Sequence, residues 1–223
     1  MFHWMECLFV RRTRLSVAEA YARWAPSYPA RAHNQLMALE EQAVLEMMPD
    51  VEGRAALDLA CGSGRYLEIL MQHKAQPIVG LDASAPMLAR ARANAANLVQ
   101  ADLLSLSLRA GKFDIVTCGL AVGHIRDLRR ALFEISRVLA PKGTVVYSDF
   151  HPIGSWLGWE RTFRGENRRE YVVPHYTHLY SDHVAACAAA GLRIDDVREP
   201  RIDFGREWQG CPAVLVIRAC KPD

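Results

Sequence analysis

The chain has 223 residues, of which 51% are hydrophobic and 23% are charged. This length and composition suit one α/β domain with a full core and argue against two complete domains. The formal net charge of +2 is too small to indicate nucleic acid or an anionic membrane as the main partner. No apolar run approaches the roughly 18 residues that a membrane-spanning helix needs.

The cysteines and the first residues bear on where the protein works. Six cysteines are scattered without a Cys-x-x-Cys pair, which indicates a reduced, cytoplasmic protein. Residues 1–15 place an apolar patch before Arg11, Arg12 and Arg14, the reverse of the charge order in a signal peptide. We therefore expect residues 1–15 to be a disordered or loosely packed extension and residues 16–223 to form a single domain.

Two helices are predicted first. Residues 16–28 predict a short helix that Ser16 caps and Pro26 ends, and this stretch carries Tyr21, Trp24 and Tyr28. Residues 34–47 predict a second helix with an apolar stripe on one face.

Strands and helices alternate from residue 54 onward. Strands are predicted at about 55–59, 77–81, 97–100, 113–118 and 144–147, and helices at about 65–73, from 84, and at 127–139. This alternation predicts parallel strands joined by right-handed crossovers, with helices on both faces of the sheet. A last helix at about 181–190 precedes strands at 192–197 and 213–219, which we expect to pair antiparallel at one edge.

The segment 151–180 interrupts this pattern, because it is long and rich in aromatic residues and arginine. A segment of this length inside a compact domain is usually functional. We expect it to form a substrate-binding lid, and a small subdomain with its own core is the alternative.

The first strand of the alternating region ends in Leu57-Asp58-Leu59-Ala60-Cys61-Gly62-Ser63-Gly64. A buried strand, a Gly-x-Gly turn and a helix together form a nucleotide-binding βα unit, although such a turn alone is common without a ligand. Asp82 and Asp102 follow the next two strands. Because the carboxyl ends of parallel strands share one edge, the three acids converge on one crevice.

The position of Asp82 indicates what this crevice binds. Asp82 lies 20 positions after Gly62, the offset at which an acid accepts hydrogen bonds from both hydroxyls of a ribose. We therefore expect a nucleoside.

Five motifs in this order resemble the class I S-adenosylmethionine-dependent methyltransferases, of the small-molecule, methyltransferase-11-like type, over about residues 21–220. Residues 57–64 form the first. The others are Gly80-Leu81-Asp82-Ala83-Ser84 with Met87-Leu88-Ala89-Arg90-Ala91 after it, Gln100-Ala101-Asp102-Leu103, Phe113-Asp114-Ile115-Val116 and Leu139-Ala140-Pro141-Lys142-Gly143-Thr144. The resemblance implies a three-layer, Rossmann-like α/β fold whose seven-stranded sheet is mostly parallel, with an antiparallel edge strand.

The resemblance also implies S-adenosyl-L-methionine as the methyl donor and S-adenosyl-L-homocysteine as the product. It assigns the methionine portion to Asp58 and the backbone of residues 60–64, the ribose to Asp82, and the adenine to Asp102 with Leu103. Ala60 stands where the family has its first glycine. The expected cofactor-binding residues are Tyr21, Tyr28, Asp58, Ala60, Gly62, Gly64, Asp82, Ala83, Met87, Asp102, Leu103 and Gly119.

Methyl transfer is an in-line displacement, and a general base helps when the acceptor is a hydroxyl or an acidic carbon. His124 and His151 follow the fourth and fifth predicted strands and are the expected catalytic residues; a purely structural, hydrogen-bonded role is the alternative for His124. The expected substrate-binding residues are Trp156, Trp159, Arg161, Tyr171, His175 and His178. We predict no metal site, because His175 and His178 lack a third ligand at a diagnostic spacing.

These patterns favour a methyltransferase for a small molecule or a carrier-bound metabolite, with O- or C-methylation favoured and a monomer or homodimer as the working unit. The resemblance extends to malonyl-carrier-protein and quinone-precursor methyltransferases, and nothing in the sequence selects between those acceptors. One alternative is a non-catalytic, S-adenosylmethionine-binding regulatory module on the same fold. Another, less favoured, is an NAD(P)-dependent oxidoreductase, whose fingerprint requires a third glycine where this chain has Leu67.

Overall fold

The computed structural model describes residues 12–91, 96–165 and 169–223. Its helices are α1 (Val17–Trp24), α2 (Gln35–Met47), α3 (Arg65–Gln72), α4 (Ala85–Leu88), α5 (Leu128–Val138), α6 (Ile153–Trp156) and α7 (Tyr180–Ala189). Its strands are β1 (Thr13–Arg14), β2 (Ala56–Leu59), β3 (Ile78–Asp82), β4 (Ala96–Gln100), β5 (Phe113–Cys118), β6 (Leu139–Phe150), β7 (Thr162–Arg164), β8 (Glu170–Val172), β9 (Arg193–Arg198) and β10 (Val214–Cys220).

The central sheet has seven strands in the order β4-β3-β2-β5-β6-β10-β9. Strands β2 to β6 are parallel, and β10 runs antiparallel to both β6 and β9. The predicted parallel alternation and the antiparallel pair at one edge are therefore confirmed. The sequence-based start of β6 is wrong by five residues, since the strand begins at Leu139 and continues through Pro141.

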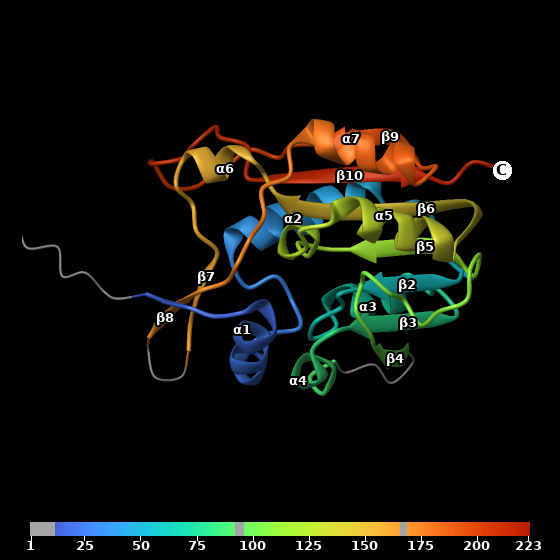
Figure 1. The fold of residues 1–223 in the computed structure, drawn as a ribbon, viewed down its shortest axis with the longest axis horizontal. Coiled ribbons are helices and arrows are strands. Elements are labelled where there is room, and N and C mark those ends of the chain that lie inside the picture. The colour runs from blue at the N-terminus through green and yellow to red at the C-terminus, as the bar shows by residue number, and fades with distance from the viewer. Residues whose placement is uncertain (1–11, 92–95, 166–168) are drawn as a thin grey trace, which may run out of the picture.

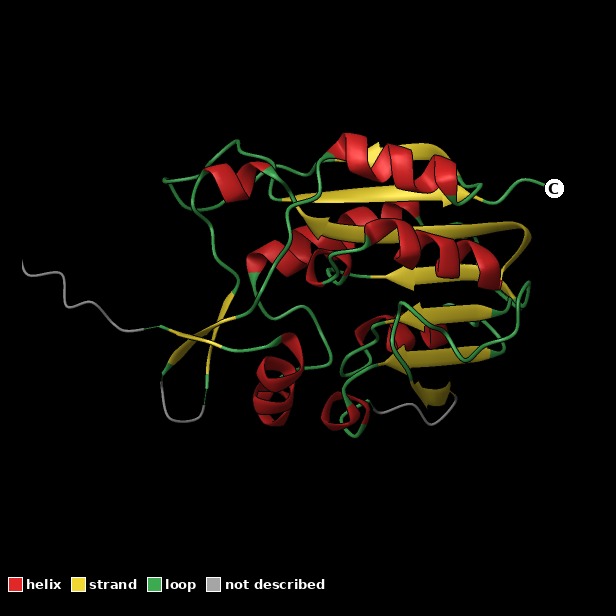
Figure 2. Ribbon diagram, viewed as in Figure 1, coloured by secondary structure: helices red, strands yellow, loops and turns green. Residues whose placement is uncertain are grey.

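Apolar side chains alternate between the two faces of this sheet. Leu57, Leu59 and Tyr147 belong to the core that packs against α5 and α7, whereas Ala56 and Val146 belong to the cores beneath α3 and α2. Figure 2 shows the resulting three layers, with the sheet between two sets of helices. Strands buried on both faces read as nearly continuous apolar runs, which is why their positions are predictable from sequence.

Polar side chains cap the N-termini of α1, α2, α4 and α5. Ser16 and Glu19 form a reciprocal capping box at α1, and the side chains of Asn34, Ser84 and Asp127 accept from backbone N–H groups at the starts of α2, α4 and α5. Among the described residues, no helix combines the length and apolarity needed to cross a bilayer.

A second sheet, in the order β1-β8-β7, was not expected. Strand β1 pairs parallel with β8, and Arg12 and Arg14 form ion pairs with Glu160 at 2.8 and 3.1 Å. The expectation of a loosely packed extension is therefore wrong for residues 12–15; residues 1–11 lie outside the described part. Strands β7 and β8 come from the segment 151–180, which thus carries regular structure of its own.

The topology determines where a ligand can bind. The chain leaves β2 toward β3 and β4 and then returns to β5 on the other side of β2, so a switch point lies between the carboxyl ends of β2 and β5. Ligands of open α/β sheets bind at such points. In Figure 1, α1 and the small sheet lie on the side toward which these parallel strands point.

Candidate active site

A cavity of about 700 Å³ lies at the carboxyl ends of β2, β3 and β5. This volume is within the range of small-molecule sites. Its lining includes Tyr21, Tyr28, Asp58, Ala60, Cys61, Gly62, Asp82, Ala83, Met87, Asp102, Leu103, Gly119, His124, Arg161 and Tyr176.

The loop after β2 forms the floor of this cavity. Ala60, Gly62 and Gly64 have φ values of 52°, 55° and 97°, in the left-handed region. A side chain costs about 1 to 2 kcal/mol in this conformation, which explains why a glycine suits the position that Ala60 occupies here. Gly64 is the N-cap of α3, so the loop turns its backbone toward the cavity at the start of a helix.

Asp82 ties this loop to the next βα connection. One of its carboxylate oxygens accepts from the Gly62 N–H at 2.8 Å, and the other accepts from the Ser84 N–H at 2.7 Å. Each oxygen keeps a second lone pair for a ligand hydroxyl. Asp82 therefore holds the loop in place and still has two acceptor positions.

Asp58 lies at the base of the same loop with 1% of its surface exposed. Its Oδ1 accepts from the Thr117 hydroxyl at 2.8 Å, whereas its Oδ2 is buried without a partner among the described residues. Burial raises the pKa of Asp58 to about 7, against the opposing effect of the Thr117 hydrogen bond. A cationic donor from a ligand would satisfy Oδ2 and favour the carboxylate.

The opposite wall is formed by α1 and the 3₁₀ turn Val122–His124. His124 Nε2 lies 2.8 Å from the Tyr21 hydroxyl, and its Nδ1 lies 2.8 Å from the Pro174 carbonyl oxygen. Because a carbonyl only accepts, Nδ1 carries the proton and Nε2 accepts from Tyr21. Burial lowers the pKa of His124 to about 2, so the ring stays neutral and is a very weak base.

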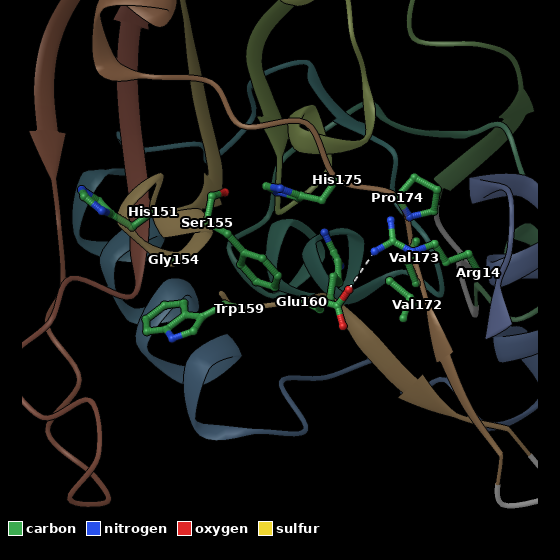
Figure 3. A pocket seen from close by; sticks show the side chains of 12 residues that line it. Arg14, His151, Gly154, Ser155, Trp159, Glu160, Val172, Val173, Pro174 and His175 are labelled. Carbon is green, nitrogen blue, oxygen red and sulfur yellow. Dashed lines mark hydrogen bonds and ion pairs between the residues drawn. The ribbon is translucent and has the colours of Figure 1, made fainter. Parts of the chain in front are cut away.

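A second cavity, of about 160 Å³, lies beside the first and shares Arg161 with it. Figure 3 shows its lining, with Glu160 joined to Arg14 and with His151, Ser155 and Trp159 along the side near α6. Arg161 NH1 donates to the Leu120 carbonyl oxygen at 2.7 Å, and its guanidinium lies over the Phe150 ring at 4.9 Å. This arginine therefore separates the two cavities and is exposed to both.

His175 lines the smaller cavity and has a buried carboxylate behind it. Its Nε2 donates to Asp149 Oδ1 at 2.9 Å, and Asp149 is 2% exposed. A Cβ on Gly123 would overlap His175 Nε2 and lie 2.5 Å from Asp149 Oδ1. The pair therefore depends on a glycine at position 123, and it leaves His175 Nδ1 without a hydrogen-bond partner in the described part of the chain.

His151 has a different environment from the one expected of a base. Its Nδ1 accepts from the Ile153 N–H at 3.2 Å, and its Nε2 lies 3.1 Å from Glu199 Oε1. Both ring nitrogens are therefore engaged, and the residue lines the smaller cavity only. Neither His151 nor His175 lines the larger cavity, whereas His124 does; His151 differs from His175 in that both of its ring nitrogens are engaged.

The predicted substrate-binding residues separate into two groups. Arg161, Trp159 and His175 line the smaller cavity. The other three line neither cavity: Trp156 is 76% exposed, Tyr171 is buried in the small core beside Phe163, and His178 Nε2 donates to the Ile125 carbonyl. A sequence shows that these side chains are aromatic but not which way the segment turns. The described residues contain no group of three or more possible metal ligands.

The predicted cofactor-binding residues lie together, with one exception. All of them line the larger cavity except Gly64, which shapes the turn behind it. Asp149, the buried carboxylate behind His175, was not among the predicted site residues, whereas Tyr176, which belongs to the expected lid, lines the larger cavity. The position of Asp149 at the end of a buried strand was the available signal.

Comparison with known proteins agrees with this geometry. Residues 57–147 match the family model of a methyltransferase domain. The chain is 33% identical to malonyl-[acyl-carrier protein] O-methyltransferase of Enterobacter lignolyticus over 80% of this chain and 68% of that protein, and 38% identical to demethylmenaquinone methyltransferase of Thermus thermophilus over 43% and 47%. The chain spans only about half to two thirds of the length of the curated relatives that it matches.

A solved structure shares the fold and part of the sequence. It is an S-adenosylmethionine dependent methyltransferase from Mesorhizobium loti, with a TM-score of 0.70 and 27% identity. The similarity covers 82% of this chain and 98% of that one.

The pKa of Asp58 predicts how stability depends on pH. The native state keeps a proton up to about pH 7 that the unfolded chain loses near 3.8, so the free energy of unfolding falls as the pH rises between these values, by at most about 1.4 kcal/mol per unit. Asp58→Asn should remove this contribution. The free energy of unfolding of the variant, measured against that of the unmodified protein at the same pH, should therefore be higher at about pH 8 than at about pH 5. Urea unfolding of both proteins tests this, and parallel pH profiles would contradict it.

The overlap at Gly123 predicts a non-additive pair of substitutions. Gly123→Ala should destabilise the protein by about 1 to 3 kcal/mol, because the methyl group displaces His175 from Asp149. Combined with His175→Ala, the same change should cost less, since the ring that it overlaps is gone. Thermal unfolding of both single variants and the double variant measures the coupling, and additive costs would show that the contact is unimportant.

Proposed function

Since the chain belongs to the class I S-adenosylmethionine-dependent methyltransferases, we propose that it transfers a methyl group from S-adenosylmethionine to an oxygen or carbon of a small or carrier-bound acceptor. One observation carries this proposal. A single cavity holds Asp58 and Asp82 at the strand ends on one side, and Tyr21, His124 and Arg161 on the other.

The residues of the cavity floor fit the donor. The unpartnered Asp58 Oδ2 suits the ammonium group of the methionine portion, and the two free acceptor positions of Asp82 suit the ribose hydroxyls. Asp102 and Leu103 line the same cavity and are the residues that we propose for the adenine. When bound, the donor supplies a sulfonium methyl group that an acceptor can attack.

The Tyr21–His124 pair positions groups rather than moving protons. A ring whose pKa is about 2 does not take a proton from an acceptor near neutral pH. By accepting from the Tyr21 hydroxyl, His124 holds that side chain against the cavity. Tyr21 also belongs to α1, so the same hydrogen bond holds α1 over the site.

We propose His175 as the general base in place of His151. Asp149 accepts a hydrogen bond from the Nε2–H of His175, so the Nδ1 lone pair is left for an acceptor's O–H or C–H proton. The acceptor loses this proton to His175 Nδ1 as it gains the methyl group, so charge balances with the loss of the sulfonium charge. Asp149 stabilises the imidazolium that forms.

Malonyl-carrier-protein and demethylmenaquinone acceptors belong to two of the relatives, and this chain spans only part of each. Both remain candidate acceptors for this chain. An acceptor on a carrier would enter through the larger cavity, because the larger one is lined by exposed Arg126 and Tyr176.

Titration with two candidate ligands tests the identity of the methyl donor. S-adenosylhomocysteine should bind in calorimetry, and NADH should not. Asp82→Ala should weaken binding by about tenfold or more, because it removes charge-assisted hydrogen bonds. Asp114→Ala is the matched control, since Asp114 accepts from the Ala55 N–H at 3.0 Å at the amino ends of β2 and β5, whereas the cavity lies at their carboxyl ends. Binding of NADH alone, or native affinity in Asp82→Ala, would refute the assignment.

Label transfer tests the base. With methyl-tritiated S-adenosylmethionine and a metabolite extract as the acceptor source, His175→Ala should lower the rate by about 10²- to 10⁴-fold while donor affinity stays unchanged. His175→Asn, which can keep a hydrogen bond to Asp149, should be equally slow. His151→Ala should retain most of the rate; a large loss there with an active His175→Ala would restore His151 as the base.

A further inference from the structure

Arg161 is held rigidly between the two cavities. Its backbone carbonyl accepts from the Val173 N–H at 2.8 Å, and its side chain is fixed by the Leu120 carbonyl and the Phe150 ring. A guanidinium has five N–H donors in a planar fork. The Leu120 carbonyl and the Tyr21 hydroxyl each accept from the Arg161 guanidinium, so its other N–H donors remain for a ligand.

No carboxylate of the described residues lies within ion-pair distance of Arg161. By contrast, Arg65 lies 2.7 Å from Glu40, and Arg137 lies 2.7 Å from Glu134. The adjacent Glu160 is shared by Arg12 and Arg14.

The carboxylate of Asp149 is hydrogen-bonded to His175 Nε2 and forms no ion pair with Arg161. A partly buried guanidinium without a counter-charge is a favourable site for an anion.

The positive charge of Arg161 also acts on side chains of the larger cavity. Its charge opposes the rise that burial causes in the pKa of Tyr21 and of Tyr28, and it adds to the fall in the pKa of His124. The Tyr28 hydroxyl lines the same cavity and has no hydrogen-bond partner in the described ranges. It is therefore free to donate to an anion near Arg161.

Resting on the proposed function, we propose that the acceptor is an organic acid whose carboxylate is bound by Arg161 and the Tyr28 hydroxyl. Planar guanidinium and carboxylate groups match in a bidentate geometry. The acceptor then spans the boundary between the two cavities, with the O–H or C–H group that becomes methylated between the donor in the larger cavity and His175, which lines the smaller one.

The carboxylate held by Arg161 positions the acceptor and is not itself methylated. Ion pairing stabilises the carboxylate charge and so makes its oxygens poorer nucleophiles. An acid with a second reactive group, such as a hydroxy acid or an oxo acid, satisfies both Arg161 and His175. The product is then a methylated acid and not a methyl ester.

Paired ligands test this inference. Protein saturated with S-adenosylhomocysteine is titrated by calorimetry with 3-hydroxy and 3-oxo acids, from 3-hydroxybutyrate to 3-hydroxydecanoate, and with the primary amide of each. At least one acid should bind, and its amide should bind about tenfold to a hundredfold more weakly. Arg161→Gln should abolish this difference, and Arg161→Lys should retain part of it. Arg164→Gln, an exposed arginine on β7, is the matched control and should behave as the unmodified protein.

The outcomes separate this inference from the proposed function. If S-adenosylhomocysteine does not bind the unmodified protein, the proposed function fails and the inference fails with it. If it binds equally well to the unmodified protein and Arg161→Gln, but no acid exceeds its amide or Arg161→Gln keeps the preference, only the inference fails. Mass spectrometry that finds a methyl ester of the bound acid would also overturn it.

Discussion

The site depends on a buried charge, the carboxylate of Glu40, which is 0% exposed. Burying a charge is costly unless it is paired, and Glu40 forms an ion pair with Arg65 and accepts from the hydroxyls of Tyr66 and Ser148. These partners belong to α3 and β6. Ser148 in turn accepts from the N–H of Leu120, whose carbonyl holds Arg161. A chain of hydrogen bonds thus leads from the core to the acceptor side of the cavity.

The two sides of the cavity arise in different ways. The donor side follows from local connections: each acid comes directly after a parallel strand, and the sheet brings these strand ends together. The acceptor side is built from segments far apart in sequence, because α1, the turn at residue 124 and the segment 151–180 meet only through tertiary contacts. Substitutions in that segment can therefore change the proposed acceptor side without disturbing the proposed donor side.

This difference explains what could be predicted from the sequence. Asp58 and Asp82 were predictable, because an acid after a buried strand has a defined place in a parallel sheet. The pairing of His175 with Asp149 was not, since it depends on the path of the segment 151–180 and on the small size of Gly123. Asp149 lies at the end of β6 and His151 directly follows that strand, so both were candidates from their positions in the sequence. The Ile153 N–H and Glu199, however, are hydrogen-bonded to the ring nitrogens of His151.

The charges along the cavity favour one arrangement of the two proposed ligands. The floor carries Asp58, Asp82 and Asp102, and the far wall carries Arg161. A donor with sulfonium and ammonium charges is attracted to the acidic floor and repelled by the arginine, whereas an organic acid has the opposite preference. Each ligand is therefore discouraged from occupying the other's end, and specificity arises from repulsion as well as attraction. A neutral residue at position 161 would remove the attraction of the organic acid and the repulsion of the donor at the far wall, while the acidic residues of the floor stay unchanged.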